Sequence, residues 1–226
     1  MRRTLSQSGL WTLPVAGLLI LVSWLPLFFV KEPGTDPAAI ARNFTDPIVL
    51  IIGPLGIIGM LCLLFGSLAI YGWLADSPES RPWAAVGMIG GVTAMALLIG
   101  IWTILSLADS ILGYLYLAGH QGVGDAFNSM SGGHWSGRIR PFQAAIFLSG
   151  AVGTVGLTVA LWRSRRVARW VAIVFGVAFA LVVWASPPTL IGAVLLMLTG
   201  ILIARNAEQP ATRLRTEARE QPILQP

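Results

Sequence analysis

The chain has 226 residues, of which 55% are hydrophobic and 11% are charged, and its mean hydropathy is +0.76. A soluble domain of this length carries about 25% charged residues, so this composition excludes a soluble globular protein. The net charge of +5 does not indicate nucleic-acid binding, because the basic residues flank apolar segments instead of forming a solvated face. We therefore expect an all-α, polytopic transmembrane helix bundle, formed by one domain (1–205) and followed by a polar, mobile cytoplasmic tail (206–226).

The first apolar segment, residues 10–30, follows Arg2 and Arg3 and is long enough to cross a bilayer, which needs about 20 helical residues. A cleavable signal peptide is the alternative, because the two arginines resemble an n-region and residues 39–41 resemble a small-residue cleavage site. The apolar run is longer than that of a signal peptide, and a charged stretch that starts at Lys31 follows it. We therefore expect a retained span.

A polar loop comes next, and Asp36 followed by Pro37 predicts a short interfacial helix in it. Aspartate is a favoured N-cap, and proline is favoured at the first helical position. The second span is expected at residues 47–74. The third apolar segment starts at residue 83 and continues to 118, which is too long for one crossing, so we expect a span over 83–107 with an extension to 118.

The second half of the chain carries three further apolar segments. In order, we expect a glycine-rich polar loop, a fourth span, a basic turn, a short fifth span and a sixth span, at residues 119–140, 141–162, 163–169, 170–185 and 188–204. The last two spans are separated by Ser186, Pro187 and Pro188. A kinked or re-entrant hairpin is the alternative for this pair, because two prolines end a helix without forcing a full crossing.

The positions of the basic residues predict the orientation of the bundle. With six spans and both termini in the cytoplasm, 11 of the 15 basic residues fall inside and four outside, as the positive-inside rule requires. Tryptophans gather at the predicted inner boundaries as well, where indole prefers the headgroup level. The basic turn carries four arginines, which we interpret first as an orientation signal and alternatively as contacts to anionic lipid headgroups: Arg163, Arg165, Arg166 and Arg169. The chain is expected in the cell (plasma) membrane as a multi-pass protein.

Glycines three residues apart predict close helix packing on two spans. They are Gly53, Gly56 and Gly59 on the second span and Gly150, Gly153 and Gly156 on the fourth. A stripe of small residues lets another helix approach closely, and Gly87, Gly90 and Gly91 extend the pattern to the third span. Packing or chance explains the likeness of the second and fourth spans better than a duplication does, because one shared pattern is not a repeat.

Asp109 is the acidic residue that lies inside an apolar segment. A charge in hydrocarbon costs about 3 kcal/mol by insertion scales, so the depth of Asp109 in the bilayer decides between a structural and a functional role. About 20 helical residues counted from Trp83 end near Thr103, which leaves Asp109 near the outer interface. We expect a carboxylate at the headgroup level, paired with Arg138 or Arg140. The alternative is a proton or cation site at the mouth of the bundle.

His120 and His134 lie in the glycine-rich loop with Asp125 between them. Two imidazoles and a carboxylate suit a transition metal, but their spacing matches no zinc-ligand pattern, so we expect solvated loop residues and no metal site. Neither a lysine nor a histidine lies within a span, which excludes a retinal Schiff base and a bis-imidazole haem. No cofactor and no catalytic residue is expected.

Several stretches together resemble a known family: the end of the first span, the loop helix, the close of the second span and the basic turn, at residues 33–39, 41–43, 68–71 and 163–169. On these residues the chain resembles a family of bacterial multi-span integral membrane proteins that is classed as a domain of unknown function. The resemblance covers most of residues 8–205 and implies a multi-span fold, but no activity, cofactor or site residue. The break at Pro187 and Pro188 and the long outer loop are not part of it.

Three classes of function are compatible with these features. The first is a non-enzymatic membrane component that works through helix packing with a membrane-protein partner or with a second copy of itself. The second is a transporter or channel for a small solute or ion, with Asp109 at its outer entrance. The third is an enzyme in the outer loop, which would require His120 and His134 to converge. We expect the first, and we do not expect an enzyme.

Overall fold

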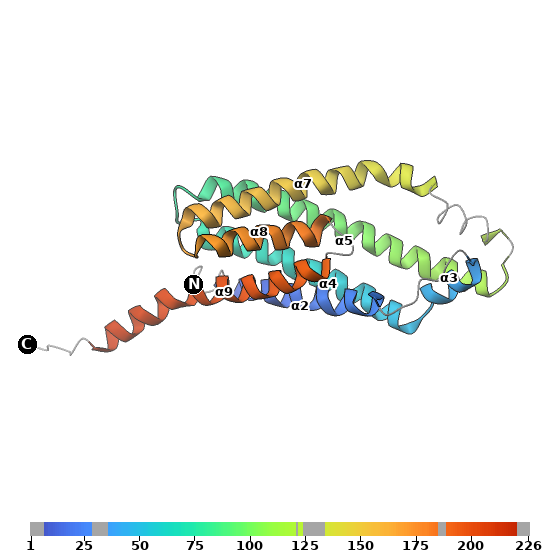
Figure 1. The fold of residues 1–226 in the computed structure, drawn as a ribbon, viewed down its shortest axis with the longest axis horizontal. Coiled ribbons are helices and arrows are strands. Elements are labelled where there is room, and N and C mark those ends of the chain that lie inside the picture. Colours follow the sequence, from blue (N-terminus) through green and yellow to red (C-terminus); the bar gives the residue numbers. More distant parts are fainter. Residues whose placement is uncertain (1–6, 29–35, 121, 124–133, 185–188, 221–226) are drawn as a thin grey trace, which may run out of the picture.

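The computed structural model describes residues 7–28, 36–120, 122–123, 134–184 and 189–220, and these residues form helices and short connections (Figure 1). The helices are α2 (Thr12–Trp24) with the 3-10 turn η1 (Leu25–Phe28), α3 (Pro37–Phe44), α4 (Pro47–Leu74), α5 (Arg81–Leu117), α7 (His134–Ser164), α8 (Arg169–Trp184) and α9 (Thr189–Glu220). The predicted all-α class is confirmed.

Five helical segments are long and apolar enough to cross a membrane: Gln7–Trp24, Pro47–Leu74, Arg81–Leu117, Arg140–Ser164 and Thr189–Glu208. The remaining apolar helix, α8, has 16 residues and is about 24 Å long, which is shorter than the roughly 30 Å hydrocarbon core of a bilayer. The structure therefore has five long candidate spans and one short apolar helix where the sequence predicts six spans.

The helices close a ring in the order of the sequence. α2 packs on α4, α4 on α5, α5 on α7, α7 on α8, α8 on α9, and α9 returns to α2 (Figure 1). Two hydrogen bonds tie the start of the first helical segment to α9: Gln7 Nε2 donates to the carbonyl of Ala207 at 3.1 Å, and Trp11 Nε1 donates to Glu208 Oε1 at 2.8 Å. The first residues described and the polar part of α9 therefore meet at one end of the bundle.

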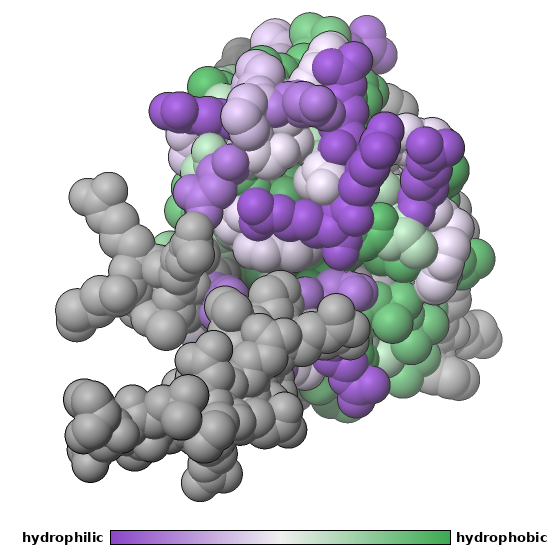
Figure 2. Space-filling view, turned by 90° about the vertical axis from the view of Figure 1, so that its left-hand side faces the viewer, coloured by the Kyte–Doolittle hydropathy of each residue, from purple (hydrophilic) through white to green (hydrophobic). Residues whose placement is uncertain are grey.

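The surface of the bundle divides into apolar sides and a hydrophilic end. Figure 2 views the end at which the α7–α8 turn lies, and hydrophilic side chains gather over its described part while apolar atoms cover the flanks. Exposed side chains on the flanks include Phe65, Ile89, Ile104, Leu148 and Ile191. Lipid is the solvent that accommodates such sides.

The interior of the ring is filled with apolar side chains. The largest fully buried ones come from every helix of the ring, and they include Leu13, Leu63, Met95, Leu157, Phe175, Phe179 and Leu196. Toward the end opposite the α7–α8 turn, Trp24 of α2 and Trp102 of α5 meet edge to face with ring centroids 5.5 Å apart. The fold thus carries its aromatic groups inside as well as at the hydrophilic end.

The polar residues among the described ones that are buried as a whole are serines and threonines: Ser23, Ser67, Ser80, Thr189 and Thr199. The hydroxyl oxygen of Thr154 is also buried, and it has no hydrogen-bond partner among the described residues. Ser67 Oγ donates to the carbonyl of Leu63 at 3.0 Å, and Thr199 Oγ1 donates to that of Leu195 at 2.7 Å. Hydroxyls that bond to the preceding turn of their own helix need no partner across the bundle. They leave the interior apolar in character.

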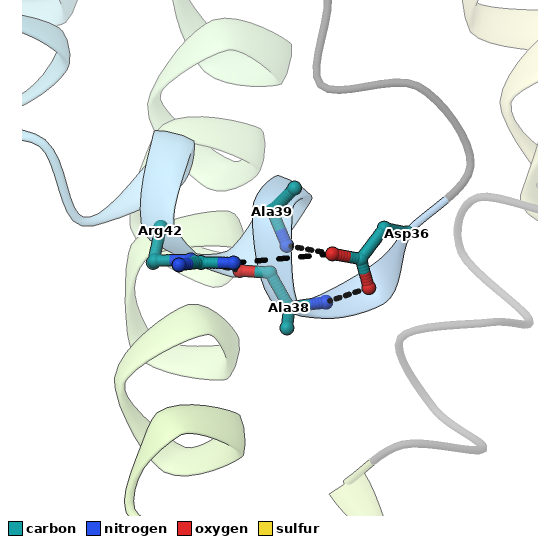
Figure 3. A network of polar contacts seen from close by, with 4 residues as sticks. All are labelled: Asp36, Ala38, Ala39 and Arg42. Carbon is teal, nitrogen blue, oxygen red and sulfur yellow. Dashed lines mark hydrogen bonds and ion pairs between the residues drawn. The ribbon is translucent and has the colours of Figure 1, made fainter.

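The short helix predicted in the first polar loop is confirmed as α3, and its interfacial position stays a prediction. The carboxylate of Asp36 accepts hydrogen bonds from the backbone N–H groups of Ala38 and Ala39 at 3.1 and 3.2 Å, and Pro37 opens the helix (Figure 3). The guanidinium of Arg42 lies 3.9 Å from the same carboxylate. α3 packs on the far part of α5. The local Asp36-Pro37 signal therefore starts a helix that packs against part of α5.

Two helices extend further than predicted, whereas α5 continues unbroken through Leu117, in agreement with the expected extension to 118. α7 starts at His134, so the last residues of the predicted 119–140 loop are helical. α9 continues from the predicted end near Ala204 through Glu220. Its polar part is rich in Ala, Arg and Glu, which are strong helix formers, so the helix outlasts the apolar segment. The mobility expected for this tail stays a prediction.

Candidate functional site

The turn between α7 and α8 brings arginines and tryptophans together at the hydrophilic end. Each of three guanidinium carbons lies over an indole ring, at 5.6 Å for Arg163 over Trp83, 5.5 Å for Arg166 over Trp73 and 5.3 Å for Arg169 over Trp162. These are cation–π distances, at which the positive charge is attracted to the negative face of the ring. The contacts join the ends of α4, α5, α7 and α8 at one level of the bundle.

Arg166 makes a second contact that sets it apart from the other arginines of the turn. Its Nη1 donates a hydrogen bond to the backbone carbonyl of Trp73, next to the last residue of α4. The last carbonyls of a helix have no partner within the helix, so this guanidinium satisfies one of them. Arg166 is half-buried, whereas Arg163, Arg165 and Arg169 are exposed. Of the four predicted headgroup contacts, three are therefore open to the surroundings.

Arg165 has an unusual backbone conformation. Its φ is +54°, in the left-handed region, and it follows the last residue of α7. Glycine commonly occupies this position after a helix, because a side chain on any other residue crowds the backbone there. Arginine at this point therefore carries strain that a glycine would not.

Asp109 lies half-buried on the side of α5 that faces α4 and α3. Residues 106, 109 and 113 are about one and two turns apart and share a helix face. Ser106 Oγ lies 3.5 Å from where a Cβ on Gly53 of α4 would stand, and a Cβ on Gly113 would lie 3.0 Å from the carbonyl of Ala41 in α3. The carboxylate is therefore on a helix face that other elements cover.

The predicted partners of Asp109 are the two arginines near the start of α7. Arg140 is exposed, and within the described residues no ion pair joins it to Asp109. The side chain of Arg138 lies outside the part that the structure describes. The structure thus brings Asp109 to α3 and α4 and leaves its pairing with Arg138 a prediction.

The two histidines of the predicted outer loop are only partly described. His120 is exposed just beyond α5, and its backbone N–H donates to the carbonyl of Leu115 at 3.2 Å. Asp125 and the side chain of His134 lie outside the described residues. Among the residues that are described, no group of three His, Cys, Asp or Glu side chains is placed to hold a metal ion. A convergence of the two imidazoles stays untested.

The glycines of the fourth span pack against those of the third within the same chain. A Cβ on Gly153 would lie 2.6 Å from the backbone nitrogen of Gly91, and one on Gly156 would lie 2.5 Å from that of Gly87. A Cβ on Gly90 would lie 2.5 Å from the nitrogen of Gly153. Real Cβ atoms do not come so close, so α5 and α7 touch backbone to backbone. Gly150 is also buried.

The glycines of the second span face other elements. A Cβ on Gly59 would lie 2.9 Å from Ile20 Cγ1 in α2. Gly56 faces Ser23 of α2 at 3.4 Å, and Gly53 faces α5 through Ser106. The small-residue positions of both predicted stripes therefore lie between helices of one chain, and a partner protein would have to use a different face.

Sequence reasoning missed two features of this arrangement. Three tryptophans at the predicted inner boundaries pair individually with arginines, whereas the sequence predicts only that both residue types gather at that boundary. The close contact of α2 with α9 was missed as well: a Cβ on Gly17 would lie 2.6 Å from the carbonyl of Ala193. An isolated glycine at residue 17 gives no local signal for such a contact, whereas the shared boundary of Arg and Trp does give one.

Comparisons with protein-family models, with curated proteins and with solved structures return no match for this chain. The resemblance to a bacterial family of unknown function therefore gains no support, and no family is identified. The hydrophobic composition and the five long apolar helices both indicate a protein that crosses a membrane several times. The chain is a multi-span helical membrane protein.

Proposed function

We propose that the protein is a non-enzymatic component of the cell membrane that packs its outer helix faces against a partner membrane protein or a second copy of itself. The observation that carries this proposal is the filled, apolar interior of the helix ring. A pathway for a solute or ion needs polar groups or water along its course. Here large side chains such as Phe175 and Phe179 are fully buried, and the buried hydroxyls of Ser67 and Thr199 bond to their own helices.

We further propose six crossings, with the arginine turn and both termini in the cytoplasm. Six helices that follow one another around a ring support this number, and so do the hydrogen bonds from Gln7 and Trp11 to α9, since an even number of crossings returns the chain to its first side. The excess of basic residues at that end supports the direction. The short α8 would be accommodated by local thinning of the bilayer.

The face that we propose for packing lies on the outer side of α5. Thr93, Ala96 and Gly100 are exposed there, about one turn apart, and a Cβ on Gly100 would meet nothing within 4 Å. Ile89 and Ile104, which are 61% and 65% exposed, lie one turn to either side of these small residues. An outer face with small residues between large apolar ones suits close approach of another membrane helix.

The test is covalent cross-linking of the full chain in its native membranes, followed by purification of the adducts. We expect a defined adduct for the wild-type protein and for Val177→Leu, which changes an exposed side chain of α8. Gly100→Leu should lose the adduct without any fall in its unfolding temperature, because nothing within the chain contacts this position and leucine favours a helix over glycine. A wild-type protein that forms no adduct would contradict the proposal.

A transporter or channel is the second candidate, and the position of Asp109 favours it. A half-buried carboxylate on a face covered by α3 and α4 suits a cation or proton near an outer entrance. Proteoliposomes that contain the wild-type protein or Asp109→Asn separate the two candidates. We expect no proton or cation flux that depends on Asp109. A flux that the substitution abolishes would replace the first proposal by this one.

A further inference from the structure

We propose that Arg163, Arg165 and Arg169 form a binding site for an anionic phosphate group, and that the phosphate belongs to a lipid headgroup. The three side chains are exposed, and the α7–α8 turn that carries them lies at the hydrophilic end of the bundle that Figure 2 views. Guanidinium groups present a planar fork of N–H donors that matches phosphate oxygens. This inference concerns a ligand of the membrane itself and does not depend on whether the chain packs with a partner.

The tryptophans place the site at the depth of lipid headgroups. Arg163 and Arg169 lie over the rings of Trp83 and Trp162, which are themselves 36% and 38% exposed. Indole side chains that face lipid prefer the boundary between hydrocarbon and headgroups. A guanidinium that lies on such a ring is held at that boundary, beside the bundle, where a lipid phosphate is the anion at hand.

The turn that carries these arginines is held in place by contacts with α4. Arg166 donates to the carbonyl of Trp73 and lies over its ring, so the middle of the turn is attached to the end of α4. Arg163 belongs to the last turn of α7, and Arg169 is the first residue of α8. The three exposed guanidinium groups therefore extend from an anchored turn, and less conformational freedom is lost when they bind.

Arg165 is the residue that the fold itself does not explain. Its φ of +54° would suit glycine, yet the residue is arginine and its side chain is exposed. Within the described residues, no hydrogen bond or ion pair of its guanidinium offsets this strain. Strained residues collect at functional positions, where a ligand gains from the side chain that the strained backbone carries.

The acidic side chains described at this end of the bundle lie outside the α7–α8 turn. Asp76 and Glu79 belong to the turn between α4 and α5, and Glu208 on α9 accepts the hydrogen bond from Trp11. The α7–α8 turn itself, residues 163–169, contains four arginines and no acidic residue. The local charge therefore favours an anion at this turn.

The test uses the purified full chain in detergent, titrated with short-chain phosphatidylglycerol, short-chain phosphatidylcholine or inorganic phosphate, with the unfolding temperature as the measurement. We expect phosphatidylglycerol to raise this temperature for the wild-type protein and for Arg140→Gln. Arg140 is an exposed arginine at the other end of the same helix, α7, and is the matched control. Arg165→Gly should need about fivefold more phosphatidylglycerol for the same rise, as expected for one basic residue at an anionic surface.

The stability of Arg165→Gly without lipid distinguishes weaker lipid binding from a loss of folding. Without lipid, its unfolding temperature should equal or exceed that of the wild-type protein, because glycine relieves the strain at a positive φ. Equal phosphatidylglycerol dependence of Arg165→Gly and the wild-type protein would overturn the proposal, as would an equal loss in Arg140→Gln. If inorganic phosphate alone stabilises the protein as well as phosphatidylglycerol does, the assignment to a lipid is wrong.

Discussion

Arg166 attaches the turn between α7 and α8 to the end of α4 through its guanidinium group. It stands in the turn between α7 and α8, donates to the carbonyl of Trp73 at the end of α4 and lies over the indole ring of the same residue. The neighbouring arginines of the turn are exposed. Four arginines that are equivalent by composition therefore divide into one that holds the fold and three that face the surroundings, because only one of them reaches an unpaired helix carbonyl.

Arg166→Gln should destabilise the bundle by about 2–3 kcal/mol, because it removes a charge-assisted hydrogen bond and a cation–π contact from a half-buried position. The measurement is reversible unfolding in mixed micelles of a mild detergent and sodium dodecyl sulfate. Arg163→Gln is the control: it removes a cation–π contact of an exposed side chain and should cost about 0.5–1 kcal/mol. Equal losses for the two variants would show that the bond to Trp73 contributes little.

At the scale of elements, the bundle depends on contacts between helix backbones. α5 and α7 touch through Gly87, Gly90 and Gly91 on one side and Gly153 and Gly156 on the other. Membrane helices gain no hydrophobic driving force from leaving lipid, so close van der Waals packing of this kind holds them together. Because these glycines are in contact between α5 and α7, they are not available for packing against a second protein.

Gly153→Ala and Gly100→Ala should change stability in opposite directions. The first places a Cβ 2.6 Å from the backbone nitrogen of Gly91, so α5 and α7 must separate, at a cost of about 1–3 kcal/mol. The second adds a methyl group where nothing lies within 4 Å, and alanine favours a helix over glycine by up to about 1 kcal/mol. Unfolding in mixed micelles measures both, and a stable Gly153→Ala protein would contradict the contact.

The cap of α3 is a second prediction at this scale. Asp36→Ala removes the acceptor for two backbone N–H groups and should cost about 1 kcal/mol, whereas Asp36→Asn should keep most of the cap. Hydrogen exchange at residues 38–44 measures the effect, because the amides should exchange faster when α3 opens more often. Unchanged exchange in Asp36→Ala would show that packing on α5 alone holds the helix.

The whole molecule is a ring in which neighbours in sequence are neighbours in space. Only the contact between α9 and α2 closes it across the length of the chain, and Gln7 and Trp11 strengthen that closure at one end. The short α8 leaves the number of crossings to be decided by accessibility rather than by helix length.

Single cysteines introduced into a Cys62→Ser background test the proposed topology in intact cells and in inverted vesicles. Arg42→Cys and Arg140→Cys should react with an impermeant thiol reagent from outside, and Arg165→Cys should react from the cytoplasmic side. Ser186→Cys should also react from outside if α8 crosses completely. Protection of Ser186→Cys from both sides would favour the re-entrant hairpin, and labelling of Arg165→Cys from outside would overturn the orientation.

The local part of the fold could be predicted from the sequence. The bounds of α4 are those expected, Pro47 to Leu74, because Asp46 caps the first turn through a 2.8 Å bond from Ile48 and an apolar run then fills the bilayer length. α3 follows from the same kind of signal. The sequence predicts that the fourth span starts at Pro141, whereas α7 starts at His134 and Pro141 lies inside the helix.

The sequence by itself determined that this protein belongs in a membrane and that its apolar segments are helical, since these properties depend on composition and on residues a few positions apart. Only the tertiary structure decided which glycines meet, that the ring closes between α2 and α9, and that Arg166 reaches Trp73. That last pair is 93 positions apart in the chain. Such contacts depend on which helices become neighbours, and no local pattern of residues contains that information.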